Sequence, residues 1–208
     1  MARKAKKPGT RKPAADPRDR LIDAAMTLAA ETGWRGLSMR AVADAAGMPL
    51  ADALGVFADK GRLLRGFTRR IDAAVLAGGG AVDPADTPRD RLFEVLMRRF
   101  DELAPYKPAV RRIARDLGRD PLALFCHADR LAGAMALMLE CAVIDSNGIS
   151  GRLRVKGLAL VYGVAIRAWL ADDSPDQAAT MAALDRALMR AERAAGLLWP
   201  AAQATPAD

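Results

Sequence analysis

The side chains most often used in catalysis or metal binding are few in this chain, and their spacing does not form a site. His127 is the only histidine, and it lies next to Cys126. Adjacent helical residues point to different faces, and no further Cys or His completes a metal-binding or nucleophilic group around them. Residues 78–80 are three glycines that lack the Lys-Ser/Thr of a phosphate-binding loop, and no glycine-elbow serine is present. We therefore expect no enzyme, no metal and no cofactor.

The N-terminus is strongly basic. Residues 1–20 contain eight Lys or Arg and two Asp, so most of the formal net charge of +7 lies there. A segment rich in Lys, Pro and Gly has too little apolar surface to fold alone, so residues 1–16 are predicted to be a disordered arm. Such an arm binds nucleic acid or an anionic membrane surface, or it only keeps the protein soluble.

The elements that would position a site are helices. Of the 208 residues 51% are hydrophobic, chiefly Ala, Leu, Met and Val, and only 5% are aromatic. Because Ala and Leu favour helix and β-branched runs are scarce, the composition predicts an all-α fold. No apolar run approaches the roughly 18–20 residues of a membrane span, and no secretory signal is recognisable. Cys126 and Cys141 fit reduced thiols, so we expect a cytoplasmic protein.

Residues 17–76 are predicted to fold as a long helix, two short helices separated by a glycine turn, and a fourth helix. Asp16, Ser38 and Asp59 are typical N-caps, and Gly33 and Gly47 are typical of helix ends. The third helix is expected over 48–57. This order of elements is that of a helix-turn-helix domain.

A second helical domain is predicted over 89–195, after a linker over 77–88 that is rich in Gly, Asp and Pro. Its helices are expected over 92–103, 110–117, 121–144, 153–170 and 175–195, with a turn at 146–148. The helix over 153–170 is apolar nearly all round, which indicates burial on several sides. Residues 196–208 are predicted to be a disordered tail.

Residues 20–64 resemble the N-terminal domain of TetR-family transcriptional regulators, without insertions. The matching residues are Ile22, Ala24, Ala25, Leu28, Gly33, Trp34, Ser38, Ala43, Ala46, Gly47, Phe57, Lys60 and Leu63. The resemblance implies a TetR-like all-α fold, with a three-helix DNA-binding domain and a C-terminal helical domain for ligand binding and dimerisation. It also implies a ligand-responsive regulator, typically a repressor, that binds DNA as a homodimer.

The third helix departs from the family where DNA would be read. Pro49 stands in place of the usual Ser or Thr, Leu54 in place of Tyr, and Val56 in place of His. The stretch MPLADALGVF has a single charged residue, Asp52, which would repel phosphates. Direct readout requires donors and acceptors in the major groove, so we expect weak and salt-sensitive DNA binding.

The resemblance places the DNA contacts on the second and third helices and their flanks. The residues expected there are Arg35, Ser38, Met39, Arg40, Pro49, Leu50, Ala51, Leu54 and Lys60. The basic members would contact phosphate. For Arg40 and Lys60 the alternative is an ordinary solvated charge.

Residues 161–192 are similar to the C-terminal region of the lipid-binding accessory family of ubiquinone biosynthesis, that of the ninth coenzyme Q protein. The shared residues are Tyr162, Trp169, Asp172, Ser174, Pro175, Asp176, Thr180, Leu184 and Asp185. This resemblance implies, as an alternative function, a lipid or isoprenoid carrier that assists ubiquinone biosynthesis and has lost DNA binding. The Ser-Pro-Asp part is also typical of an ordinary helix start.

A small apolar or lipid ligand is expected between the helices of the second domain, where bundle cavities occur. The candidate lining is Leu96, Phe100, Tyr106, Phe125, Met135, Met138, Tyr162 and Ile166. A homodimer is expected through the last two helices, with Trp169, Leu184 and Leu188 as anchors. For both sets the alternative is an ordinary intramolecular core. The cluster over 197–199 is either the frayed end of the last helix or a peripheral membrane contact.

Overall fold

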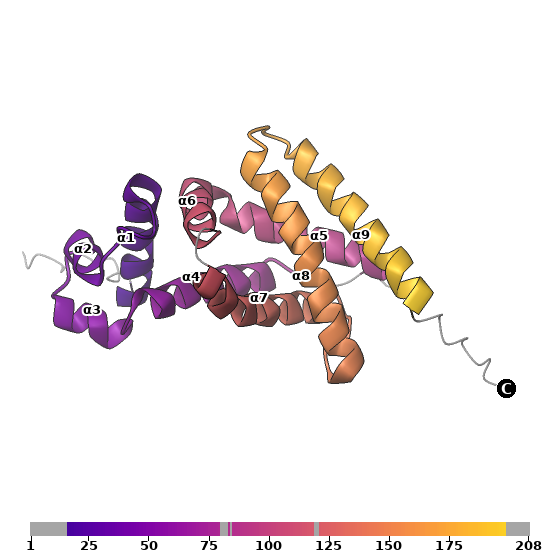
Figure 1. Ribbon diagram of the computed structural model, residues 1–208, viewed down its shortest axis with the longest axis horizontal. Helices are drawn as coiled ribbons and strands as arrows, with labels where there is room; N and C mark the ends of the chain where they lie inside the picture. The colour runs from indigo at the N-terminus through magenta and orange to yellow at the C-terminus, as the bar shows by residue number, and fades with distance from the viewer. Residues whose placement is uncertain (1–15, 80–82, 84, 119–120, 199–208) are drawn as a thin grey trace, which may run out of the picture.

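The computed structural model describes residues 16–79, 83, 85–118 and 121–198, without the side chains of 121–130 and 195–198. Within these residues the chain is helical and contains no strand. Figure 1 shows the first helices gathered at one end and the later helices packed as a bundle. The helices are α1 (Pro17–Thr32), α2 (Met39–Ala45), α3 (Leu50–Val56), α4 (Lys60–Ala77), α5 (Pro88–Leu103), the 3-10 helix η1 (Ala104–Tyr106), α6 (Lys107–Leu117), α7 (Pro121–Cys141), α8 (Gly148–Ala171) and α9 (Ala178–Leu198).

The first three helices form the head that the cap residues predict. The Asp16 carboxylate accepts from the Arg18 N–H at 2.9 Å and begins α1. The Ser38 hydroxyl oxygen accepts from the Ala41 N–H at 3.1 Å and begins α2. The next helix, α4, begins in the same way, because the Asp59 carboxylate accepts from the Arg62 N–H at 2.8 Å. Each of these contacts satisfies a backbone donor that a helix start leaves without an intrahelical partner.

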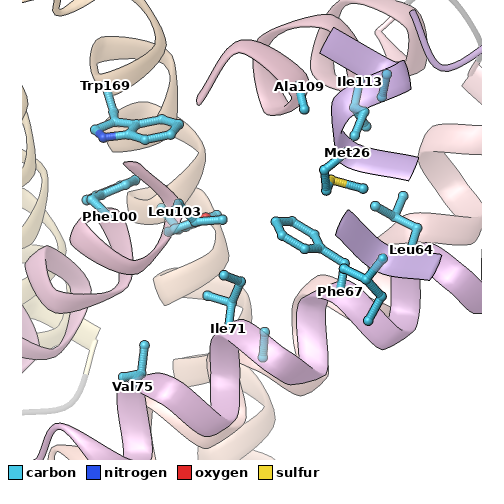
Figure 2. Packing of buried hydrophobic residues seen from close by; sticks show 14 of the residues in the cluster. Met26, Leu64, Phe67, Ile71, Val75, Phe100, Leu103, Ala109, Ile113 and Trp169 are labelled. Carbon is cyan, nitrogen blue, oxygen red and sulfur yellow. The ribbon is translucent and has the colours of Figure 1, made fainter. Parts of the chain in front are cut away.

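Helix α4 belongs to the head and to the bundle at the same time. Its buried face runs the length of the helix through Leu63, Leu64, Phe67, Ile71 and Val75. Near its start this face packs with α1, and further along it packs with α5 and α7. Figure 2 shows residues of α1, α4, α5, α6 and α8 in this one cluster of buried side chains. The two parts of the molecule therefore share a continuous hydrophobic core.

The bundle is organised around an aromatic stack. The Phe100 ring of α5 lies parallel to the Tyr162 ring of α8 at 5.6 Å, and it stacks on the Trp169 ring at 5.7 Å. Helices α8 and α9 run side by side (Figure 1). Trp169 is 1% exposed and Phe100 is 0% exposed, so the stack is interior to a single chain.

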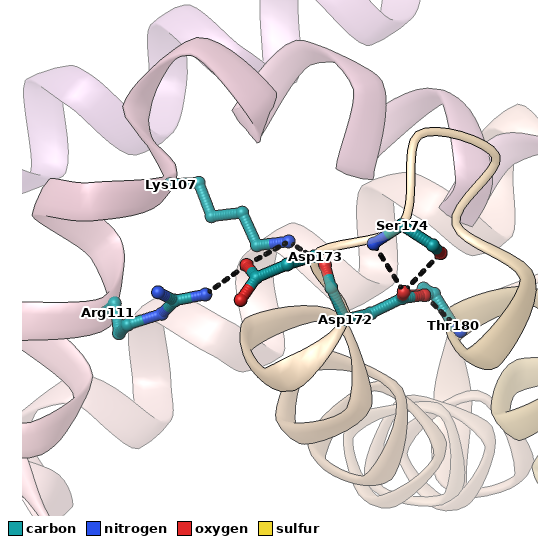
Figure 3. A network of polar contacts seen from close by, with 6 residues as sticks. All are labelled: Lys107, Arg111, Asp172, Asp173, Ser174 and Thr180. Atoms are coloured by element: carbon teal, nitrogen blue, oxygen red, sulfur yellow. Dashed lines mark hydrogen bonds and ion pairs between the residues drawn. The ribbon is translucent and has the colours of Figure 1, made fainter.

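Several helix ends differ from the sequence-based boundaries. Helix α8 begins at Gly148, within the predicted turn, and α9 begins at Ala178, after the predicted Ser-Pro-Asp start. Asp172 explains the second difference, because its carboxylate accepts from the Thr180 N–H and from the Thr180 hydroxyl, both at 2.8 Å. The same carboxylate accepts from the Ser174 N–H at 3.1 Å and from its hydroxyl (Figure 3). The segment with Ser174 is therefore a capping loop that precedes the helix.

We predict that Asp172→Asn destabilises the start of α9. Hydrogen bonds from Ser174 and Thr180 hold the pKa of Asp172 well below its usual value. A carboxylate of this kind stabilises the fold above its ordinary pKa of about 4, and this contribution is lost as the pH falls below that value. In urea unfolding of the full chain, the variant should unfold at lower urea than wild type at pH 7, and the difference should shrink toward pH 3.

The matched control is Asp44→Asn, an exposed aspartate on α2. Its midpoint should stay close to wild type at both pH values. Equal midpoints for wild type and Asp172→Asn at pH 7 would contradict the capping role.

Candidate DNA-reading head and ligand cavity

The turn between α2 and α3 is fixed to α1 by one arginine. The Arg20 guanidinium donates to the Ala46 carbonyl oxygen and to the Gly47 carbonyl oxygen, the latter at 3.2 Å. Gly47 has φ +61°, a backbone conformation that residues other than glycine rarely adopt. The helix-turn-helix geometry predicted from the sequence is therefore present, and it is held from behind by α1.

The outward surface of α3 is almost entirely apolar. Ala53 is buried beneath it, and Leu50 is half-buried. The exposed positions are Pro49, Ala51, Asp52, Leu54 and Gly55. This face offers bases van der Waals contact, and its one carboxylate is of the kind that accepts from a cytosine amino group. It offers phosphates no side-chain donor.

The basic residues predicted to contact DNA have different roles in the structure. Arg35, in the loop before α2, and Arg40, in the first turn of α2, are exposed. The Lys60 ammonium instead donates to the carbonyl oxygens of Trp34 and Arg35, at 3.1 and 3.4 Å, and lies 5.8 Å from the Trp34 ring centre. Lys60 therefore braces the loop between α1 and α2. Ser38 serves as the α2 cap, and Met39 is half-buried against the core.

The Asp116 carboxylate joins the loop between α1 and α2 to the bundle. Asp116, near the end of α6, accepts from the Trp34 N–H at 2.8 Å and from the Arg35 N–H at 3.1 Å, both through Oδ2. Gly33 has φ +83°, and a Cβ at that position would lie 3.2 Å from the same oxygen. The sequence gives no sign of this contact, because the partners are 82 residues apart.

A second junction is built on Arg70 of α4. Its guanidinium pairs with Asp23 of α1 at 2.8 Å and donates to the Tyr106 hydroxyl at 2.9 Å. The Tyr106 ring meets the Phe67 ring edge-on at 5.1 Å. Tyr106, predicted as a ligand-contacting residue, thus connects η1 to α4. Through Arg70 it is also linked to α1.

The bundle contains a cavity of about 180 Å³ where five helices meet. Its walls are mostly apolar, and Phe67, Ile71, Leu103 and Ile113 can be followed in Figure 2. The lining is Leu64, Phe67, Thr68 and Ile71 of α4, Arg99 and Leu103 of α5, Val110 and Ile113 of α6, Leu131 and Ala134 of α7, and Tyr162 and Ile166 of α8.

The structure places the residues predicted to line a ligand site at different distances from this cavity. Tyr162 and Ile166 border the cavity, whereas Tyr106 is not among its lining residues. Leu96, Phe100, Met135 and Met138 are fully buried core residues outside its walls. The Phe125 side chain lies outside the described part of the structure. An apolar helix position can face a neighbouring helix or a cavity, and only the packing of the helices decides between them.

One residue of the cavity wall, Arg99, belongs to a buried ion pair that the sequence-based prediction missed. The Arg99 side chain is 5% exposed and pairs through Nη1 with Asp72 of α4, which is 14% exposed. Its guanidinium lies 5.7 Å from the centre of the Tyr162 ring. Burial disfavours the charge, but Tyr162 and Asp72 outweigh that effect and hold the pKa of Arg99 above its usual value. Within the described residues, Arg99 Nε has no hydrogen-bond partner.

The residues predicted to anchor a dimer are buried within the single chain. Trp169, Leu184 and Leu188 are 1%, 0% and 4% exposed in a single chain, so they support its own core. A different set of apolar residues is exposed on α8 and α9, namely Ile149, Leu153, Leu160, Val164 and Met181. The four on α8 fall on one side of the helix, because their spacing of 4, 7 and 4 residues follows its period.

Other predicted features are tested only in part. No group of three or more His, Cys, Asp or Glu in the described part of the chain could hold a metal ion. None of the helices described is both long and apolar enough to cross a bilayer. The side chains of Cys126 and His127, the basic arm over 1–15 and the cluster over 197–199 lie outside the described residues or side chains.

Comparison with known proteins relates the chain to one group. Residues 21–64 match the family model described as "Bacterial regulatory proteins, tetR family". The chain is similar to a TetR transcriptional regulator from Nitrosomonas europaea, at 20% identity and a TM-score of 0.68, over 85% of this chain and 98% of that one. It is also similar to a TetR transcriptional regulator from Rhodococcus sp. RHA1, at 21% identity and 0.61, over 84% and 95%.

A third similar structure is a "multidrug binding protein EbrR complexed with imidazole", at 24% identity and a TM-score of 0.53, over 84% of this chain and 96% of that one. No curated protein matches the chain. The three solved structures share the fold over most of both chains. They give no support to the resemblance between residues 161–192 and the ubiquinone accessory family. The Asp-x-Ser-Pro-Asp segment has a local explanation as the capping loop of α9.

We predict that Asp116→Ala loosens the loop between α1 and α2. The amides of Trp34 and Arg35 lose a charged acceptor, and a hydrogen bond of that kind contributes about 1.5–3 kcal/mol. Amide hydrogen exchange of these two residues should speed up by roughly tenfold or more, while the Ala25 amide inside α1 should keep its rate. The control is Arg115→Ala, the exposed neighbour on α6. Unchanged exchange at Trp34 and Arg35 would mean that α1 and α4 hold the loop without α6.

Proposed function

We propose that this protein, which has a TetR-type N-terminal domain and the TetR fold, is a homodimeric transcriptional regulator whose DNA binding responds to a small apolar ligand. The observation that carries the proposal is the position of the cavity. Its walls include α4 and α6, and the same two helices hold the head through Arg70 and Asp116. A ligand that favours one spacing of α4 and α6 therefore favours one position of the head.

The DNA-binding step is proposed to depend on phosphates more than on bases. Arg35 and Arg40 are exposed next to the apolar face of α3 and are placed to contact the backbone. Specificity then depends on thymine methyl groups, on Asp52, and on two heads bound to half-sites at a fixed spacing. We place this activity in the cytoplasm, where a bacterial regulator meets DNA.

The dimer is proposed to form through the exposed side of α8. Leu160 is 76% exposed and Val164 49%, and both lie on a helix that is otherwise largely apolar. Two copies related by a two-fold axis would bury the same stripe on each chain. Two heads held in this way have a fixed spacing, which a single chain does not provide.

One similar structure supports the ligand-binding part of the proposal. The structure of EbrR, which has a TM-score of 0.53 to this chain, is described as a multidrug binding protein in complex with imidazole. That ligand belongs to EbrR and does not identify the ligand of this chain. The alternative function as a lipid or isoprenoid carrier is not favoured, because a cavity of about 180 Å³ is small for a lipid chain. A carrier would also have no use for the contacts of Arg70 and Asp116 that join the head to the bundle.

We predict that the full chain binds DNA from upstream of its own gene and that binding weakens steeply between about 50 and 200 mM salt. Replacing Arg35 and Arg40 together by Ala should weaken binding to specific and random DNA alike and reduce the salt slope by about 2. Fluorescence anisotropy with labelled duplexes measures both. The control is Arg190→Ala, an exposed arginine on α9, which packs with α8 and α5. If random competitor DNA at an equal concentration abolishes binding to the upstream DNA, the proposed role as a specific regulator is contradicted.

We predict that Leu160→Asp turns the dimer into monomers. A carboxylate in a desolvated stripe opposes its own copy across the two-fold axis. Sedimentation velocity should show a dimer for wild type and a monomer for the variant at micromolar concentration, with unchanged helicity. Leu76→Asp, a change of the same type at an exposed position of α4, should remain dimeric. A wild-type monomer would exclude the proposed α8 interface.

A further inference from the structure

We infer that the exposed side of α8 forms, together with a second copy of the chain, a binding site for a small multivalent oxyanion of the phosphate class. Lys156 and Arg167 of both copies would hold the anion. The inference rests on the proposed homodimer and adds a ligand that controls its formation. The exposed side of α8 has apolar residues suited to self-association, but all of its charges have the same sign.

Two cationic residues share the side of α8 that carries the exposed apolar stripe. Lys156 lies four residues before Leu160, and Arg167 lies three residues after Val164. These spacings follow the helical period, so both cations face the same way as the stripe. Both are exposed, as is Arg152 one turn before Lys156. A molecule that covers the apolar stripe therefore meets these cations as well.

The middle of this surface is open and has little side-chain bulk. Gly157 and Gly163 lie three residues before and after Leu160. A Cβ at either glycine would meet no atom within 4 Å among the described residues. Because glycine has no side chain, another helix can approach α8 closely at these positions. A close approach would also bring the cations of the two copies near one another.

No carboxylate of α8 or α9 is placed to neutralise these cations. α8 contains no Asp or Glu. α9 contains two, Asp185 and Glu192, and both pair with Arg89 of α5, at 2.7 and 3.8 Å. The carboxylates just before and just after α8 are engaged in ion pairs or in the cap of α9. Within the described residues, Lys156 and Arg167 have no ion-pair partner.

A two-fold interface brings the same surface of both copies together. The cations beside the stripe therefore meet cations of the second copy, whichever way the two helices run, and like charges across an interface oppose binding. A multivalent oxyanion removes this repulsion, because ammonium and guanidinium groups from both copies donate charge-assisted hydrogen bonds to its oxygens. Formation of the dimer then depends on the anion, and so does DNA binding by two linked heads.

Sedimentation velocity of the full wild-type chain without DNA tests the inference, with pyrophosphate as the probe. Two buffers of equal ionic strength are compared, one with NaCl alone and one with millimolar pyrophosphate in place of part of the NaCl. The dimer dissociation constant should be roughly tenfold lower with pyrophosphate. In NaCl alone it should rise when the salt is lowered from about 200 to about 20 mM, because the repulsion is then less screened.

The variant carries Lys156→Gln and Arg167→Gln together. It should dimerise more tightly than wild type in low NaCl and should lose most of its response to pyrophosphate. A tighter dimer separates the effect of charge from the loss of an ordinary contact, which would weaken the dimer. The matched control carries Arg65→Gln and Arg69→Gln, two exposed arginines on α4, and it should behave as wild type.

The other outcomes overturn the inference. A dimer that tightens as NaCl is lowered, or that has the same dissociation constant in the two buffers of equal ionic strength, excludes the anion site but leaves the proposed homodimer in place. An unchanged response to pyrophosphate in the variant means that Lys156 and Arg167 do not hold the anion. A wild-type monomer in every buffer excludes both the anion site and the proposed homodimer. If the variant does not fold, the two wild-type comparisons decide the question.

Discussion

The arrangement of this molecule depends on the buried face of α4. Leu63 and Leu64 pack in the head, while Ile71 and Val75 pack in the bundle, and one helix carries all four. Because apolar surface is buried at both ends of a rigid helix, neither part can separate without exposing the other. Leu64, Phe67 and Ile71 of this face also line the cavity. The proposed response to a ligand would therefore act through the packing of α4.

Polar contacts fix the orientation of the head, in addition to the apolar packing of α4. Asp116 reaches the head from α6, and Arg70 reaches α1 and Tyr106 from α4. The two contacts lie on different helices that both border the cavity. Hydrophobic burial is not directional, whereas hydrogen bonds fix an orientation. Together they define how the head sits relative to the bundle.

The sequence predicts local features well and long-range features poorly. The caps at Asp16, Ser38 and Asp59 form as expected, since the partners lie within three residues. The junction of Asp116 with Trp34 and the pair of Arg99 with Asp72 connect helices far apart in the chain, so no periodic pattern indicates them. The apolar residues of the bundle were predicted as buried, but not whether each faces the cavity or a neighbouring helix. A polar residue within an apolar helical stripe, as at Arg99, was the available sign of the site.

The joint at Asp116 has a further geometric property. Both amides meet the same atom, Oδ2, instead of being divided between the two carboxylate oxygens. A Cβ at residue 33 would lie 3.2 Å from that oxygen, so a larger residue there would crowd the atom that both amides share. Two consecutive residues of the loop, Trp34 and Arg35, are thereby tied to one atom of α6. Because α1 also packs on α6, the chain leaves α1 at a point set by the bundle, and the α2–α3 unit takes its position from there.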